Sequence, residues 1–216
     1  MSRPHVVVHV AVSLDGATTG FPVDVARFYE LARAWREDVT LAGADTILVQ
    51  ESELAKAPRP GPALDAPILA VVDSRGRVRE WEALRDCGYW SGVIALRSEA
   101  TPGQGATAVP ELVVGADRVD LAAALEALAD REGTRLVRVD SGGALIGALL
   151  RNHLVDELSF LIHPCTVGSA GERRWHGPEP VGALRLTRTS VESLDDGLVW
   201  LRYRGSGSAA SSPPRA

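Results

Sequence analysis

The regular alternation of short apolar runs with helical segments constrains the fold of this chain more than any other feature. Apolar or β-branched runs of four to nine residues, bounded by turn-forming residues, are typical of buried strands. Such runs occupy residues 5–13, 39–43, 68–73, 91–96, 111–115, 134–140 and 158–164. Strands that alternate with helices form mainly parallel sheets with helices on both faces. The sequence therefore predicts an α/β fold around a mostly parallel central sheet.

Capping residues place two of the helices. Asp24 and Asp120 each precede an apolar stripe with helical spacing, and an aspartate in that position accepts a hydrogen bond from an N–H group of the first turn. The stripes are Phe28, Leu31, Ala32 and Trp35 in the first helix and Leu121, Leu125 and Leu128 in the second. The Pro-rich and polar stretch 51–67 is predicted to be a surface loop.

The C-terminal part of the chain follows a different pattern. Residues 182–194 and 197–204 are strand-like and are joined through an Asp-Asp pair, which predicts an antiparallel hairpin at the edge of the sheet. The last segment, GSGSAASSPPRA, offers almost nothing that could pack. We therefore expect one domain over residues 1–204 and a disordered tail over residues 205–216.

Charge and composition exclude several classes of protein. The formal net charge of −5 is spread along the chain, so no basic surface for nucleic acid or an anionic membrane is expected. Cys87 and Cys165 form no C-x-x-C pair, and the histidines have no metal-ligand spacing. No run is long enough to span a bilayer. We expect a cytoplasmic protein without a metal site.

Two glycine-rich segments are candidates for phosphate binding. GQGATA, residues 103–108, matches G-x-G-x-x-A but lies between prolines and opens no helix, so we reject it. Ser141-Gly142-Gly143 lies between a strand and a helix, where free N–H groups and the helix dipole attract anions. Glycine lets a phosphate approach the backbone closely. A plain turn between strand and helix explains the same residues.

Five motifs occur in an order that resembles the reductase domain of riboflavin biosynthesis, a pyrimidine reductase related to dihydrofolate reductase. The motifs are VAVSLDG, GADT, VVDSRGRV, VDSGGALIGALL and GLVWLRYR, spread over residues 5–204. The resemblance implies a dihydrofolate-reductase-like fold, NADPH as the hydride donor, and a homodimer. It also implies an enzyme that resembles 5-amino-6-(5-phosphoribosylamino)uracil reductase and transfers a hydride to a small heterocyclic or imine-like substrate.

The resemblance also assigns roles to residues of this chain. The implied cofactor-binding residues are Ala11, Thr46, Gln50, Ser74, Ser141, Gly142, Gly143, Ala144 and Leu145. Asp140 takes the place of a family glutamate that touches the substrate. Arg75 and Arg77 are candidates for the adenosine 2′-phosphate that distinguishes NADPH from NADH, although they also fit a solvated turn.

Asp24 is a second catalytic candidate. The segment PVDVARF resembles the first helix of dihydrofolate reductase, where the aspartate of P-x-D is the active-site carboxylate. On that reading Asp24 relays a proton beside hydride transfer. The alternative reading, in which Asp24 is the N-cap of the helix, uses the same carboxylate for a structural hydrogen bond.

The chain departs from the family where the substrate's phosphate is expected. Ala57 stands in the place of an arginine near the ribose phosphate, and Lys56 or Arg59 could substitute for it. An arginine expected on the first helix is displaced, with Arg33 and Arg36 as the nearest candidates. These departures leave two alternatives open: a dihydrofolate reductase proper, and a nucleotide-binding protein that has lost its substrate pocket.

Overall fold

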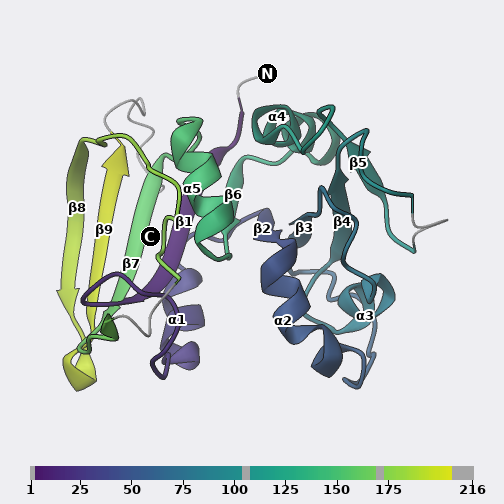
Figure 1. Cartoon of the computed structure of the whole chain (residues 1–216). Helices are drawn as coiled ribbons and strands as arrows, with labels where there is room; N and C mark the ends of the chain where they lie inside the picture. The colour runs from purple at the N-terminus through teal and green to yellow at the C-terminus, as the bar shows by residue number, and fades with distance from the viewer. Residues whose placement is uncertain (1–2, 104–107, 169–172, 206–216) are drawn as a thin grey trace.

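The computed structural model describes residues 3–103, 108–168 and 173–205, which form one nine-stranded sheet with helices on both faces (Figure 1). The strands are β1 (His5–Ser13), β2 (Val39–Gly43), β3 (Ile68–Val72), β4 (Gly92–Arg97), β5 (Glu111–Val113), β6 (Leu136–Val139), β7 (Glu157–His163), β8 (Leu186–Ser193) and β9 (Val199–Gly205). The helices are α1 (Val25–Ala32), α2 (Ala44–Leu54), α3 (Trp81–Asp86), α4 (Leu121–Glu132), α5 (Gly143–Arg151) and the short 3-10 helix η2 (Asp195–Gly197).

The strand order is β5-β4-β3-β2-β6-β1-β7-β9-β8. The first seven strands of the chain pair in parallel, and β9 pairs antiparallel with both β7 and β8. The predicted α/β class, the mostly parallel sheet and the C-terminal hairpin are therefore confirmed. Because β6 enters between β1 and β2, the carboxyl ends of β2, β3 and β6 meet at one edge of the sheet, which is where parallel sheets usually bind ligands.

Alternating residues of the central strands separate the two faces of the sheet. Val6, Val8 and Val10 of β1 join a core cluster that includes the apolar residues of α4 and α5. Ala11 of the same strand packs instead against Phe28 of α1. Helices α2 and α3 cover the neighbouring strands on the α1 side through a further cluster. Among the described residues, no helix combines the length and the apolar content that crossing a membrane requires.

The predicted N-caps are confirmed, but the sequence analysis missed the helices α2 and α3. Asp24 accepts a hydrogen bond from the Arg27 amide at 2.9 Å, and Asp120 caps α4 in the same way. Helices α2 and α3 were not predicted, and the loop expected over 51–67 is wrong in its first four residues, which belong to α2. Three of the four residues in Thr46–Val49 are β-branched, a composition that favours a strand over a helix. A parallel connection from β2 to β3 nevertheless needs a crossover such as this helix.

Two predictions fall largely outside the described residues. Residues 104–107 of the rejected GQGATA motif are among those not described, as are residues 206–216 of the expected tail. Gly205, where that tail was expected to begin, is instead the last residue of β9. The division into one domain and a disordered tail stays a prediction.

Glycines allow α5 to touch another segment of backbone. A Cβ added at Gly143 would overlap with the Arg174 carbonyl oxygen and the Gly177 amide, and one added at Gly147 would overlap with the His176 carbonyl oxygen. Nothing lies within 4 Å of the position that a Cβ would take at Gly142. The two glycines of the predicted phosphate turn therefore differ: Gly143 is needed for packing, and Gly142 opens onto free space.

This difference predicts that adding one methyl group destabilises the fold much more at Gly143 than at Gly142. Gly143→Ala should lower the free energy of unfolding by roughly 1–3 kcal/mol or more, because backbone must move to accept the methyl group. Gly142→Ala is the matched control and should cost about 1 kcal/mol or less, the difference between glycine and alanine at an N-cap. Urea denaturation of both variants measures the contrast. Equal losses of stability would contradict the packing role of Gly143.

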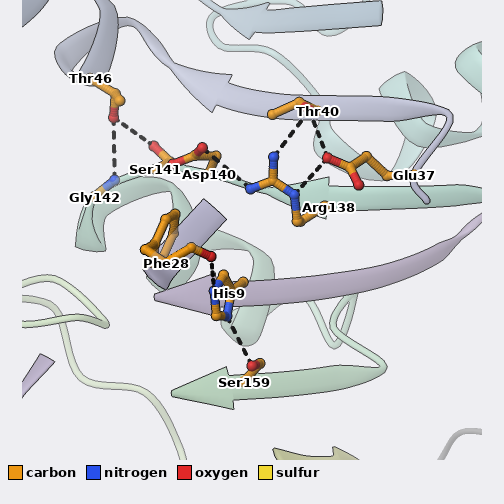
Figure 2. Close-up of polar contacts among 10 residues, drawn as sticks. All are labelled: His9, Phe28, Glu37, Thr40, Thr46, Arg138, Asp140, Ser141, Gly142 and Ser159. Atoms are coloured by element: carbon orange, nitrogen blue, oxygen red, sulfur yellow. Dashed lines mark hydrogen bonds and ion pairs between the residues drawn. The ribbon is translucent and has the colours of Figure 1, made fainter. Parts of the chain in front are cut away.

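His9 is a buried, uncharged histidine in the centre of the sheet. Its Nε2 lies 3.1 Å from the Phe28 carbonyl oxygen and its Nδ1 lies 2.9 Å from the Ser159 hydroxyl, which also accepts from Trp200 Nε1 at 2.8 Å (Figure 2). The Nε2–H tautomer satisfies every partner, because a carbonyl can only accept. Burial lowers the pKa of His9 from 6.5 to about 4, with a smaller contribution from the nearby Arg138 and Arg202.

The lowered pKa predicts a loss of stability in mild acid. Since the unfolded chain binds the proton more readily, stability from the neutral ring is complete above pH 6.5 and declines as pH falls toward 4. Between pH 7 and pH 5 this costs about 2 kcal/mol, at 1.4 kcal/mol for each pKa unit. Urea denaturation at both pH values should show the loss in the wild type, and His9→Gln should reduce it. The same pH dependence in both proteins would contradict the role of His9.

Candidate active site

A cavity of about 620 Å³ opens at the carboxyl ends of β2, β3 and β6. Gly43 and Thr46 line it from the start of α2, Ser74 from the turn after β3, and residues 141–145 from the start of α5. The first amides of α5, from Gly143 to Leu145, have no acceptor within the helix because no earlier turn exists. They carry the positive end of the helix dipole toward the cavity.

A small hydrogen-bond network holds this helix start in place (Figure 2). Ser141 Oγ accepts from the Gly43 amide at 3.0 Å and lies 3.1 Å from Thr46 Oγ1. Thr46 Oγ1 in turn accepts from the Gly142 amide at 3.3 Å. The two hydroxyl groups therefore join the ends of β2 and β6, and they fix the backbone that the predicted phosphate turn contributes.

Basic side chains surround the same cavity. Arg75, Arg77, Arg118, Arg173 and Arg174 all line it. The Arg77 guanidinium pairs with Asp45 at 2.7 Å, and that of Arg174 donates to the Asp15 carbonyl oxygen. Arg75 lies exposed on the turn next to Ser74, whose hydroxyl accepts from the Val119 amide at 3.0 Å. The cavity thus combines a helix N-terminus with several cations, which suits a ligand that carries phosphates.

A second, larger cavity of about 1490 Å³ lies between α1 and α2 and shares Thr46 with the first. Tyr29, Arg33 and Arg36 line it from α1 and the segment that follows, and Gln50 lines it from α2. Arg36 has a left-handed backbone with a φ of 47°, which is unusual for a residue other than glycine. Arg33 and Arg36 are both exposed, so their charges are available at the opening of the cavity.

A buried arginine lies on the floor of the second cavity, between two carboxylates (Figure 2). Arg138 is 3% exposed; its Nε donates to Glu37 at 2.6 Å and its Nη1 donates to Asp140 at 3.3 Å. Burial opposes its charge, but the carboxylates of Asp140 and Glu37 raise the pKa of the Arg138 guanidinium above its ordinary value. A buried cation is tolerated because it is paired in this way, and the three groups together keep one net negative charge.

Tyr29 lies on α1 and lines the same cavity as this charged group. Burial and the negative charge of Asp140 raise the pKa of Tyr29, so its phenol stays protonated at neutral pH. The Asp140 carboxylate itself is held by Arg138 Nη1 at 3.3 Å.

The structure distributes the predicted site residues between the two cavities. Thr46, Ser74 and the run from Ser141 through Gly142, Gly143 and Ala144 to Leu145 line the first cavity, together with Arg75 and Arg77. Gln50 and Asp140 line the second. Asp24 and Ala11 line neither: the Asp24 side chain caps α1, and Ala11 is covered by Phe28.

Sequence reading missed the group formed by Glu37, Arg138 and Tyr29. One signal was available, because an arginine inside the apolar strand LVRV needs a partner when it is buried. The identity of that partner could not be inferred, since Glu37 lies 101 residues away along the chain. Lys56 and Arg59, considered as substitutes for the missing arginine, pair instead with Glu53 and with Glu80 and Glu82.

Comparison with known proteins identifies relatives along most of the chain. A 2,5-diamino-6-ribosylamino-4(3H)-pyrimidinone 5′-phosphate reductase of Archaeoglobus fulgidus is 30% identical over 77% of this chain and 83% of its own length. The enzyme of the same name from Methanothermobacter thermautotrophicus is 31% identical over 91% of this chain and 96% of its own. These relatives are named for a diaminopyrimidinone, whereas the motifs indicated a resemblance to an enzyme named for the corresponding uracil.

Solved structures share the fold at lower identity. A pyrimidine reductase-like protein from Corynebacterium diphtheriae superposes with a TM-score of 0.71 at 16% identity, covering 94% of this chain and 92% of its own. A dihydrofolate reductase from Enterococcus faecalis superposes with a TM-score of 0.52 at 12% identity, covering 95% and 98%. The dihydrofolate-reductase-like fold expected from the motifs is therefore confirmed.

The family model described as the RibD C-terminal domain matches residues 4–200, nearly the whole of the sheet. This match spans four of the five motifs that suggested the resemblance and the first half of the fifth, GLVWLRYR. The chain therefore belongs to the RibD C-terminal domain family, the pyrimidine reductases of riboflavin biosynthesis.

Proposed function

We propose that this chain is an NADPH-dependent reductase that acts on 2,5-diamino-6-ribosylamino-4(3H)-pyrimidinone 5′-phosphate, the compound named for its relatives. One observation carries the proposal: a phosphate-binding cavity and a cavity with a fixed carboxylate meet at Thr46, beside the sequence Asp140-Ser141. A cofactor in the first cavity and a substrate in the second would therefore come into contact.

The first cavity fits a nicotinamide dinucleotide. The free space at Gly142 and the α5 amides suit a pyrophosphate, and Thr46 and Ser141 hold that backbone in place. When bound, the cofactor supplies the hydride, and the protein supplies orientation and exclusion of water. The surrounding arginines support NADPH over NADH, with Arg75 beside Ser74 as the residue that reads the 2′-phosphate.

In the second cavity, the residues of this chain would bind and orient the substrate. Asp140, held by Arg138, would accept hydrogen bonds from ring N–H or amino groups. Arg33 and Arg36 would hold the phosphate, in place of the family arginine whose position Ala57 occupies. Reduction of an imine-like bond also needs a proton at nitrogen. The role of Asp24 as its donor stays a prediction, and the Asp24 carboxylate caps α1 outside both cavities.

Turnover and cofactor binding together test the proposed function. The purified chain, given NADPH and the diaminopyrimidinone phosphate, should oxidise NADPH, followed by the loss of absorbance at 340 nm. Tryptophan fluorescence quenching reports NADPH binding separately. Binding without oxidation would favour the alternative in which the chain binds nucleotides but has lost its substrate pocket. The expected homodimer and cytoplasmic location stay predictions, and sedimentation of the purified chain would test the dimer.

The assignment of Arg75 predicts a loss of selectivity between cofactors. Arg75→Gln should weaken NADPH binding about 10- to 100-fold, the usual worth of a charge-assisted hydrogen bond. It should leave NADH binding unchanged, because NADH lacks the 2′-phosphate. Arg79→Gln is the matched control, since Arg79 is exposed on the same turn and, among the described residues, is not part of the cavity wall. Fluorescence titration of both cofactors measures the effect; an equal loss for NADH would contradict the assignment.

The assignment of Arg33 and Arg36 predicts an effect that depends on the substrate's phosphate. The double variant Arg33→Gln/Arg36→Gln should raise KM for the phosphorylated substrate about 10- to 100-fold, through loss of charge-assisted hydrogen bonds. KM for the dephosphorylated nucleoside should not change. Arg27→Gln serves as the control on the preceding helix α1, because Arg27 pairs with Glu30 at 2.8 Å. Steady-state kinetics with both substrates measures the contrast, and an equal rise in KM for both would exclude phosphate recognition.

A further inference from the structure

The carboxylates at the floor of the second cavity form an edge that can accept hydrogen bonds. Arg138 donates from Nε to Glu37 and from Nη1 to Asp140, and its Nη2 lies 3.5 Å from Thr40 Oγ1. Tyr29 lines the cavity beside these residues. One guanidinium and two carboxylates together keep one net negative charge, which a ligand in the cavity would face.

Asp140 is the more accessible of the two carboxylates. The Asp140 side chain is 21% exposed, whereas that of Glu37 is 10% exposed. A carboxylate offers about four lone-pair sites, and Arg138 takes one of those on Asp140. Sites therefore remain on Asp140 for a ligand. Its backbone also places it well, because it directly precedes Ser141 and therefore lies where the two cavities adjoin.

Such a carboxylate would distinguish two rings after which related reductases are named, the 2,5-diamino-4(3H)-pyrimidinone and the 5-aminouracil. In a 2-amino-4(3H)-pyrimidinone, the N3–H and the 2-amino group present two parallel donors, which match one carboxylate as a guanidinium does. In a uracil, the 2-amino group is replaced by a carbonyl oxygen. That oxygen would face a carboxylate oxygen with no proton between them, which leaves a polar contact unsatisfied.

We propose that Asp140, held by Arg138, makes this chain select the 2-amino-4-pyrimidinone ring over the uracil ring. The inference rests on the proposed function and deepens it, because it assigns the choice between two substrates to one side chain. Asp140 would touch the substrate, whereas Arg138 acts through it as a positioning residue.

Turnover of two matched substrates tests the selectivity. The wild-type chain should use the diaminopyrimidinone ribotide with a kcat/KM about 10- to 100-fold higher than for 5-amino-6-(5-phosphoribosylamino)uracil, the range expected when a polar group is left unpaired. Asp140→Asn should reduce this preference at least about 10-fold, since a carboxamide offers one donor and one acceptor and so suits the N3–H and carbonyl edge of uracil. The new asparagine keeps an oxygen for Arg138.

Glu37→Gln is the matched control at the other end of the group. It should keep the preference for the diaminopyrimidinone, because Glu37 is the less accessible carboxylate. A preference lost in Glu37→Gln but kept in Asp140→Asn would overturn the assignment to Asp140. Equal use of both substrates by the wild type, or a preference for the uracil, would overturn the selectivity while leaving the reductase function intact.

A binding measurement keeps the inference testable if neither substrate is reduced, an outcome that would refute the proposed function. Isocytosine (2-amino-4-pyrimidinone) and uracil differ in the C2 substituent and in the proton on N1, and they share the N3–H and C4 carbonyl. Each can be added to the chain with NADP+ in a thermal unfolding assay. Isocytosine should raise Tm, uracil should not, and Asp140→Asn should remove the difference. Equal shifts of Tm in the wild type would overturn the inference.

Discussion

The entry of β6 between β2 and β1 is the constraint on which the rest of this structure depends. It brings a strand from late in the chain into the centre of the sheet, so that residues 136–145 run from the core to the edge where ligands bind. Arg138 and Asp140, before the turn at Ser141-Gly142, line the second cavity. The residues from the turn to the start of α5 line the first cavity. A shift of β6 by one residue would invert its side chains and displace both contributions at once.

Charge is distributed between the two cavities in opposite ways. The first gathers guanidinium groups around a helix N-terminus and so favours phosphates. The second buries its cation between two carboxylates and leaves cationic arginines only at its opening. A substrate with an amino-bearing ring that donates hydrogen bonds and an anionic tail would match this arrangement along its length. The same distribution would disfavour a ligand entering in the reverse orientation.

Features set by local sequence could be predicted, and features set by distant contacts could not. Asp24 and Asp120 predicted the starts of α1 and α4, because an N-cap aspartate bonds to amides only two or three residues further along the chain. The start of α5 was predicted as a phosphate site because its glycines interrupt a strand and open a helix. Gly142 and Gly143 could not be told apart, since only the approach of residues 174–177 gives Gly143 its packing role. The partnership of Glu37 with Arg138 depends on the pairing of β2 with β6, which no local pattern reveals.

The contact between α5 and residues 174–177 joins main chain to main chain, and this has a consequence for how the family can diversify. Because Gly143 and Gly147 meet carbonyl and amide groups, these contacts do not depend on side chains of that segment, although Trp175 also packs against Phe160. Arg173, which precedes the segment and lines the first cavity, could therefore vary. Evolution could retune the preference for one dinucleotide over another at this position while the scaffold beneath it stays constant.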